Sequence, residues 1–214
     1  MATNGMAATS QPLATLAALK VLENGGNAAD AAVTAAAVLN VVEPHMSGIG
    51  GDMFALVQFK NKYRAYNGSG GAPEEANIDD YRKICATHTD SSEFQNLDTQ
   101  PTEGELKMPT KGGLATTVPG ALSGWFDLLE KYGTISLSEA FEPAIHYARS
   151  GFPVSEYISW QWSFASDRIK PYTETVNTYL PNGNAPLPGE LFSNPKLADT
   201  LELISKEGID EFYG

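Results

Sequence analysis

Apolar residues at helical spacing open the chain. From Leu13 to Leu22 the apolar positions recur every three or four residues, which predicts a helix. Ser10 and Pro12 mark its start, and the two glycines at 25–26 mark its end. This segment has the hydrophobic stripe of a helix that packs against a protein core.

A second helix is predicted over residues 28–42, where alanine and valine occupy most positions. Asn27 is its expected N-cap, and Pro44 ends it. A helix that is apolar on nearly every side and rich in small side chains is expected to be buried against close neighbours. Asp30 interrupts the apolar run, which is also shorter than the roughly 20 residues that a membrane span needs.

A β-hairpin is predicted after these two helices. Aliphatic and aromatic residues dominate residues 53–60 and 62–66, and Asn61 supplies the short turn between them. Residues 67–73 are expected to form a loop. The stretch 83–109 is rich in Thr, Ser, Asp, Glu and Gln and shows little periodicity, so it is interpreted as a surface excursion.

The second half of the chain is predicted to be mostly helical. Pro119 fits the first turn of a helix that ends at Gly133. Ser136 and Glu139 form a capping-box pair for another helix over residues 137–149. The other expected elements are a strand at residues 114–118, helices at 155–167 and 195–207, and a loop rich in Pro, Asn and Gly at 171–189. Two helices, a hairpin and then mostly helices favour an α+β layered fold over a parallel α/β sheet.

The excess of acidic residues limits the kinds of partner that the chain is expected to bind. Twenty-six acidic residues against fourteen basic ones give a net charge of −12, which repels nucleic acid and anionic membrane surfaces. Neither is expected as a partner. The first residues lack the charged start and apolar stretch of a signal peptide, so the simplest compartment is cytoplasmic. A mature secreted form would begin in the same way.

Candidate catalytic and metal-binding side chains are few. Cys85 is the single cysteine, which excludes a disulfide or a cysteine-based metal cluster within these residues. His88 lies three residues on and suggests a nucleophile, but the polar surroundings of Cys85 favour an incidental loop thiol. The three histidines, His45, His88 and His146, have no metal-ligand spacing and are interpreted as surface or structural residues. No metal and no cofactor is expected.

The glycine-rich loop at residues 47–51 invites comparison with phosphate-binding loops, because bare backbone amides bind anions. A nucleotide-binding loop runs from strand to helix, whereas this one runs from a predicted helix to a predicted strand and lacks the lysine. A sharp reversal with positive φ and close backbone packing is the preferred interpretation, and Asp52 is expected to cap the loop amides. The sequence supplies no Gly-x-Ser-x-Gly or HExxH motif and no Ser-His-Asp arrangement.

Several short blocks follow one another in a set order. They are NGMAATSQPLA at residues 4–14, GGNAADAA at 25–32, LNVVEP at 39–44, SGIGGDMF at 47–54, VPG at 118–120, KYG at 131–133 and GFPV at 151–154. Such a set, spread over most of the chain, is hard to obtain by chance. On these blocks the sequence closely resembles the gamma-glutamyltranspeptidase family.

The resemblance implies a precursor that cuts itself into a large and a small subunit and so exposes a threonine at a new amino terminus. It also implies the N-terminal-nucleophile hydrolase fold, a four-layer αββα sandwich of which this helix-rich α+β chain would be a part. In such enzymes the threonine hydroxyl attacks an amide, its own amine helps as base, and the acyl-enzyme passes to water or an acceptor amine. The nucleophile would lie downstream, so no catalytic residue is expected in this chain.

The same resemblance sets the expected organisation and partners. Residues 1–214 would form a single incomplete domain from the N-terminal part of the large-subunit region. The partners would be the rest of the large subunit, the small subunit, and a small-molecule amide or gamma-glutamyl substrate of the kind found in glutathione metabolism.

One departure from the family pattern concerns substrate binding. Members that act on gamma-glutamyl compounds usually carry an arginine in an Arg-Glu-x-Ala-Pro block, where the guanidinium pairs with the donor's α-carboxylate. Here the block reads Ser-Gly-Gly-Ala-Pro, and Ser69 stands at the arginine's position, where a neutral hydroxyl does not replace a bidentate cation. The expected substrate-binding residues are Ser69, Gly70 and Asn67. Arg64 or Arg82 would have to supply a substitute cation.

Three functions therefore stay open. The first is an amide hydrolase or acyltransferase with a substrate preference altered around Ser69. The second is an acylase of the same fold that prefers dicarboxylate-type or other non-gamma-glutamyl amides. The third is a noncatalytic scaffold or interaction fragment, which the absence of a downstream Thr-Thr-His-type block would favour.

Overall fold

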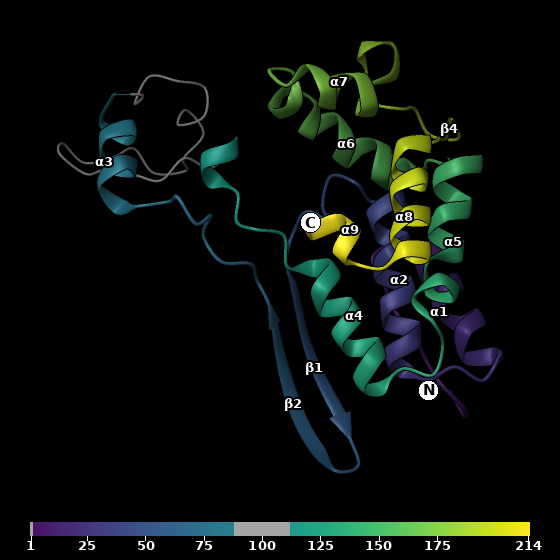
Figure 1. Cartoon of the computed structure of the whole chain (residues 1–214). Coiled ribbons are helices and arrows are strands. Elements are labelled where there is room, and N and C mark those ends of the chain that lie inside the picture. Colours follow the sequence, from purple (N-terminus) through teal and green to yellow (C-terminus); the bar gives the residue numbers. More distant parts are fainter. Residues whose placement is uncertain (1, 88–111) are drawn as a thin grey trace. The chain divides into compact units, whose positions relative to one another are not determined.

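The computed structural model describes residues 2–87 and 112–214 and is drawn in Figure 1. Contacts between residues divide the chain into two compact units. Unit 1 comprises Met1–Ile49 and Ala121–Gly214, and unit 2 comprises Gly50–Gly120.

Unit 1 begins with the two predicted helices, α1 (Pro12–Glu23) and α2 (Ala28–Val42). Gln11, rather than Ser10, caps α1, because its side-chain oxygen accepts a hydrogen bond from the backbone N–H of Leu13 at 2.5 Å. The Ser10 hydroxyl instead donates to the carboxylate of Glu43, just past the end of α2. Together α1 and α2 form an antiparallel pair, and the Ser10–Glu43 hydrogen bond joins the start of α1 to the end of α2.

Helix α2 is the buried centre of unit 1. It packs against α1, α4 (Ala121–Tyr132) and α5 (Leu137–Ser150), which surround it in Figure 1. Its four valines are almost fully buried, as are Ala31, Ala35 and Ala37, whereas Ala28 and Ala32 are exposed. Small side chains let the neighbouring helices approach closely, so this helix is the core onto which the others pack.

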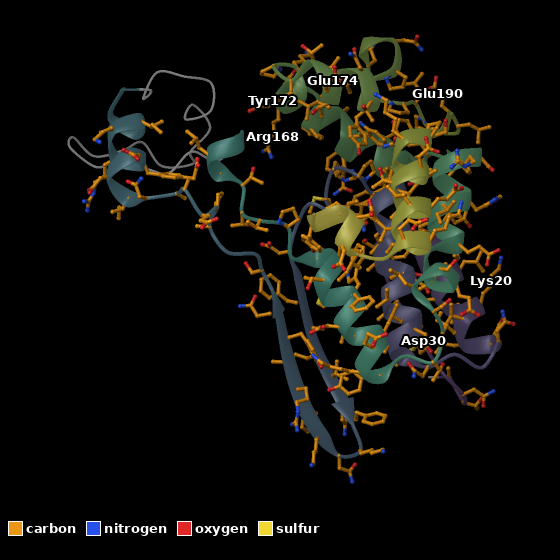
Figure 2. The ribbon with its side chains drawn as sticks, viewed as in Figure 1. Lys20, Asp30, Arg168, Tyr172, Glu174 and Glu190 are labelled. Carbon is orange, nitrogen blue, oxygen red and sulfur yellow. The ribbon has the colours of Figure 1, made fainter. Side chains whose placement is uncertain are left out.

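Asp30 fixes the start of α2 against the loop between α4 and α5, and Figure 2 labels it there. Its buried carboxylate accepts hydrogen bonds from the Thr134 hydroxyl at 2.6 Å and from the backbone N–H groups of Asn27 and Thr134, both at 2.8 Å. Burial alone raises the pKa of this carboxyl, but the hydrogen bonds, first among them that of the Thr134 hydroxyl, outweigh burial and lower the pKa overall. Asp30 is therefore a structural carboxylate.

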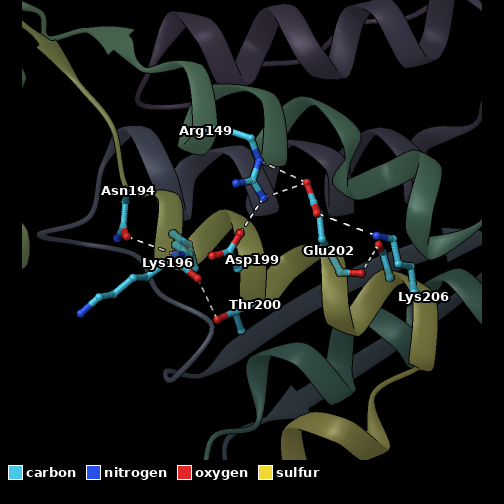
Figure 3. A network of polar contacts seen from close by, with 9 residues as sticks. Arg149, Asn194, Lys196, Asp199, Thr200, Glu202 and Lys206 are labelled. Atoms are coloured by element: carbon cyan, nitrogen blue, oxygen red, sulfur yellow. Dashed lines mark hydrogen bonds and ion pairs between the residues drawn. The ribbon is translucent and has the colours of Figure 1, made fainter.

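Helix α5 follows the predicted capping box and packs against α8 (Pro195–Glu207). The Ser136 hydroxyl accepts from the backbone N–H of Glu139 at 3.2 Å, and the Glu139 carboxylate accepts from the backbone N–H of Ser136 at 2.8 Å. On the surface, Arg149 of α5 bridges two carboxylates of α8, Asp199 at 2.8 Å and Glu202 at 2.9 Å (Figure 3). Apolar contact and surface ion pairs thus hold the same two helices.

The rest of unit 1 includes a cluster of aromatic rings. It contains α6 (Glu156–Ile169), α7 (Thr173–Tyr179), the short turn η2 (Pro181–Gly183), the strand pair β3 (Phe152–Pro153) and β4 (Leu191–Phe192), and the last helix α9 (Asp210–Tyr213). The buried ring of Trp162 meets that of Phe192 edge to face, with 4.8 Å between centroids. Trp162 also donates its indole N–H to the backbone oxygen of Tyr179 at 2.9 Å. Helix α7 lies where the sequence predicted only a loop, so that prediction was wrong.

Unit 2 is built on the predicted antiparallel hairpin of β1 (Met53–Phe59) and β2 (Lys62–Gly68). Lys60 and Asn61 both have positive φ, as a two-residue type I′ turn requires. Helix α3 (Ile78–Thr87) and a single 3₁₀ turn, η1 (Gly113–Ala115), follow. The predicted strand at residues 114–118 is therefore wrong, because its first residues form this turn.

The predicted surface excursion at residues 83–109 lies mostly outside the described residues. Its first residues belong to α3, which the sequence analysis did not predict. The predicted α+β class, rich in helices, agrees with the elements that the structure describes, in which both sheets are two-stranded.

Candidate substrate-binding loop

The expected substrate-binding residues form a turn at the end of β2. Strand β2 ends at Gly68, and the Asn67 side-chain oxygen accepts a hydrogen bond from the backbone N–H of Ser69 at 3.0 Å. An Asn side chain bonded to the backbone two residues on is a recognised turn-forming device. Asn67 and Ser69 are exposed, and Gly70 is partly buried. Residues 67–70 are called the Ser69 loop below.

Two other glycine-containing segments of unit 2 lie beside the Ser69 loop. The backbone N–H of Val118 donates to the oxygen of Gly71 at 2.9 Å, and the backbone N–H of Gly120 donates to the oxygen of Gly51 at 3.1 Å. The structure therefore brings together three of the blocks singled out in the sequence, although they lie far apart along the chain. Of the predicted site residues, Asn67 contacts Ser69, and Gly70 lies directly against the segment at 118–120.

Neither candidate substitute cation is engaged with the Ser69 loop in the described residues. Arg64 lies in the middle of β2, where its guanidinium donates to the backbone oxygen of Tyr63 at 3.0 Å. Five residues of extended strand separate Arg64 from Ser69, a distance of roughly 16 Å. Arg82 pairs with Asp79 of its own helix at 3.3 Å. The loop therefore presents a serine hydroxyl and backbone groups, without a paired guanidinium.

The family model for Gamma-glutamyltranspeptidase matches residues 14–214. The chain belongs to the gamma-glutamyltranspeptidase family.

Relatives of this family share both sequence and fold with the chain. The "Glutathione hydrolase-like YwrD proenzyme" of Bacillus subtilis (strain 168) is 36% identical, over 99% of this chain and 37% of the relative. The crystal structure of Helicobacter pylori gamma-glutamyltranspeptidase superposes with a TM-score of 0.84 at 31% identity, covering 100% of this chain and 57% of the other. The crystal structure of a cephalosporin acylase from Bacillus halodurans gives a TM-score of 0.81 at 37% identity, covering 95% of this chain and 36% of the other.

These gamma-glutamyltranspeptidase relatives confirm the predicted family and the helix-rich α+β fold of the N-terminal-nucleophile hydrolase type. The chain spans little more than a third of the first of them, at 37% of its length. It thus corresponds to part of what is, in these relatives, a longer proenzyme.

The glycine-rich segment before β1 differs from its predicted geometry. No glycine between residues 48 and 51 has positive φ, so the expected sharp left-handed reversal is absent from this loop. Asp52 is exposed and makes no hydrogen bond among the described residues, so the predicted cap onto the loop amides is also absent. The expected close backbone packing is present at Gly51, through its bond to Gly120.

The histidines that the structure describes have structural surroundings. One ring nitrogen of His45, Nε2, lies 3.0 Å from the side-chain oxygen of Gln161, and the His45 ring lies beside Trp162 with 6.5 Å between centroids. His146 of α5 lines a cavity of about 500 Å³ between α1 and α5. His88 lies outside the described residues, and Cys85 belongs to α3 rather than to a loop. Among the described residues, no group of three His, Cys, Asp or Glu side chains is placed to hold a metal ion.

The described helices differ from what a membrane-spanning helix requires. None of them combines the length and the apolar character that crossing a bilayer requires.

Proposed function

We propose that this chain is the N-terminal segment of an enzyme that breaks the amide bond of an acyl donor and passes the acyl group to water or to an acceptor amine. The observation that carries the proposal is membership of the gamma-glutamyltranspeptidase family over residues 14–214. The nucleophile would be a threonine downstream of this chain, activated by its own α-amine, and backbone or side-chain donors near it would stabilise the oxyanion. This chain would supply scaffold and part of the substrate pocket.

The substrate would be chosen partly by the Ser69 loop. A guanidinium and a carboxylate form a strong bidentate pair, whereas a serine hydroxyl offers one neutral hydrogen bond. Because Arg64 and Arg82 have other contacts in the described residues, a donor's α-carboxylate would gain little at this loop. This favours an amide hydrolase or acyltransferase with weak selection for gamma-glutamyl donors.

The second candidate is an acylase that prefers dicarboxylate-type amides. The cephalosporin acylase of Bacillus halodurans matches the chain at 37% identity, while the first curated relative is named glutathione hydrolase-like, so the family context supports either chemistry. A noncatalytic scaffold is the third candidate. It requires that the precursor lack a downstream Thr-Thr-His-type block, which the complete coding sequence reveals.

The remaining expectations follow from the same proposal. The main partners would be the rest of the precursor and a small-molecule amide. The cytoplasmic location expected from the sequence stays a prediction.

A panel of anilides tests the substrate class with the full-length protein. Gamma-glutamyl anilide, 4-aminobutyryl anilide and glutaryl anilide share the scissile bond but differ in the α-carboxylate or the α-amine. We expect kcat/KM for the first two to agree within about tenfold, because the loop lacks the cation that would separate them. A dominant glutaryl activity supports the dicarboxylate acylase, and no turnover of any amide contradicts an enzymatic role.

A further inference from the structure

The Ser69 loop is held by an unusually close meeting of backbones. A Cβ atom placed on Gly70 would lie 1.4 Å from the carbonyl oxygen of Val118. A Cβ atom placed on Gly120 would lie 2.1 Å from the carbonyl oxygen of Gly68 and 2.9 Å from the backbone nitrogen of Gly70. We call Gly68, Gly70 and Gly120, together with the Val118 carbonyl, the glycine junction.

The glycine junction tolerates no side chain without moving the loop. Ordinary contacts of a Cβ atom begin at about 3.4 Å, so a methyl group on Gly70 would have to move the two backbones apart by roughly 2 Å. The obstacle is backbone, not the end of a flexible side chain, so a methyl group on Gly70 requires one of the two backbone segments to shift. Ser69 lies between two members of the junction and would move with them.

The position of Ser69 therefore depends on the backbone contacts of Gly70 and Gly120. We infer that Gly70 and Gly120 are positioning residues that set the substrate preference of the enzyme through Ser69, an inference that rests on the function proposed above. Misplacing a binding group by about 1 Å is enough to cost on the order of a hundredfold in rate. The junction would fix whichever side chain stands at residue 69 at the place where the donor's acyl group is recognised.

Gly71 provides a matched control. It is the next residue along the chain, yet a Cβ atom on Gly71 would have no neighbour within 4 Å, and its backbone φ is one that any residue adopts. Gly70→Ala and Gly71→Ala make the same chemical change one residue apart. They differ only in whether the added methyl group meets backbone.

The experiment uses a gain of function at residue 69 in the full-length protein. The readout is the ratio of kcat/KM for gamma-glutamyl anilide to kcat/KM for 4-aminobutyryl anilide, which differ in the α-carboxylate. We expect Ser69→Arg to raise this ratio at least tenfold. The gain should persist in Ser69→Arg/Gly71→Ala and fall below about threefold in Ser69→Arg/Gly70→Ala.

The ratio of the two kcat/KM values distinguishes a misplaced residue 69 from a general loss of stability or activity. A role confined to stability would lower both values of kcat/KM together and leave the gain from Ser69→Arg intact in the Gly70→Ala background, and that result overturns the inference. Equal behaviour of the Gly70→Ala and Gly71→Ala backgrounds overturns it as well. Non-additivity of this kind is the signature of two residues that act through one another.

A folding failure is also decisive. If Gly70→Ala does not yield processed protein, Gly120→Ala is used in the same way, because its closest contact is less severe. If neither variant yields processed protein while Gly71→Ala does, the junction serves folding alone and the inference is wrong. Wild-type protein that turns over no amide contradicts the proposed function first, and this inference with it.

Discussion

At the scale of single residues, the clearest structural device is the buried carboxylate of Asp30. It accepts hydrogen bonds from the backbone N–H of Asn27 at the start of α2 and from Thr134 and Ile135 in the loop before α5. All of these groups donate to the two carboxylate oxygens, so a side chain at residue 30 must offer hydrogen-bond acceptors and not donors. One side chain thereby joins segments about a hundred residues apart.

Asp30→Asn should be strongly destabilising. The substitution replaces one carboxylate oxygen by an NH₂ group that faces other donors, and leaving such buried groups unsatisfied costs about 2–3 kcal/mol. Urea unfolding of the full-length protein measures the change in the free energy of unfolding. Asp52→Asn, at an exposed carboxylate without a hydrogen bond among the described residues, is the matched control and should have little effect. Equal midpoints for the two variants would contradict the structural role of Asp30.

Acid should remove the contribution of Asp30. Its pKa is lowered in the folded protein, so its contribution to stability is fully present above the unfolded value of roughly 3.9. That contribution is lost as the pH falls through the lowered folded value. The difference in stability between wild type and Asp30→Asn should shrink as the pH drops below about 4. Unfolding midpoints recorded across that range for both proteins test this, and a constant difference would count against it.

Residue 69 carries the prediction on specificity. An arginine–carboxylate contact in a partly buried pocket is worth on the order of 1.5–3 kcal/mol, which is roughly ten- to over a hundredfold. Ser69→Arg should therefore improve kcat/KM for gamma-glutamyl donors relative to donors that lack the α-carboxylate. Ser69→Gln, which is long but neutral, is the control. If the unmodified enzyme already prefers gamma-glutamyl amides strongly, another cation serves the carboxylate.

At the scale of elements, α5 and α8 are joined both by buried apolar residues and by the ion pairs of Arg149. The ion pairs lie at the surface, where water and salt screen them. Leu201 and Phe141, in contrast, are fully buried. The apolar contact should therefore dominate the attachment of α8.

Leu201→Ala should destabilise far more than Arg149→Gln. Removing a buried leucine leaves a cavity and costs about 3 kcal/mol. Loss of the exposed Arg149 pairs should give a small change that fades further at high salt. Thermal melts of both variants of the full-length protein at low and high ionic strength make the comparison. A larger effect for Arg149→Gln would show that the ion pairs, not the buried contacts, hold α8.

Elements with strong local signals could be predicted from the sequence, and those without them could not. The helix at Ala28–Val42 has an Asn cap and a proline stop, and Pro195–Glu207 opens with proline and closes before glycine, so their bounds follow from the chain itself. Helix α7 is followed by Pro181, but it has no capping side chain at its start and no buried residue, so its composition suggested a loop. Residues 114–118 have strand-like side chains, but the chain there turns instead.

The candidate site shows the same division. Ser69 was found because its block departs from the family pattern, which is a local observation. The glycine junction joins residues about fifty positions apart, and the spacing of Gly70 and Gly120 in the sequence does not predict that they are in contact. Contacts of this kind are set by tertiary packing and become visible only in the structure.

At the scale of the whole molecule, this chain leaves apolar surface uncovered. Phe54 and Leu56 lie on the exposed side of β1, with 69% and 87% of their surfaces accessible. Trp160 on α6 is 57% exposed; its ring stacks on that of Tyr157 and meets that of Phe164 edge to face, both on the same helix. Apolar surface exposed on a strand or a helix commonly marks where another segment packs.

The isolated chain should therefore associate with itself or bind hydrophobic dyes. Light scattering after size exclusion and dye fluorescence measure the two effects, with the full-length protein as reference. Replacing both Phe54 and Leu56 by Thr should reduce them, because Thr keeps the strand preference and removes apolar area. A sharp cooperative melt from a strictly monomeric sample of the unmodified chain would argue that its surface needs no partner.

Catalysis is the property that this chain should lack by itself. Its predicted share of the enzyme is the scaffold and the Ser69 loop, whereas acyl transfer needs a nucleophile to form the covalent intermediate. A pocket without one still binds a donor, since binding and bond cleavage depend on different groups. Purified chain incubated with gamma-glutamyl and 4-aminobutyryl anilides should release no more product than an empty-vector preparation, while the full-length protein does. Turnover by the isolated chain, retained after removal of its single thiol by Cys85→Ser, would mean that the reacting group lies within these 214 residues and that the proposed division of labour is wrong.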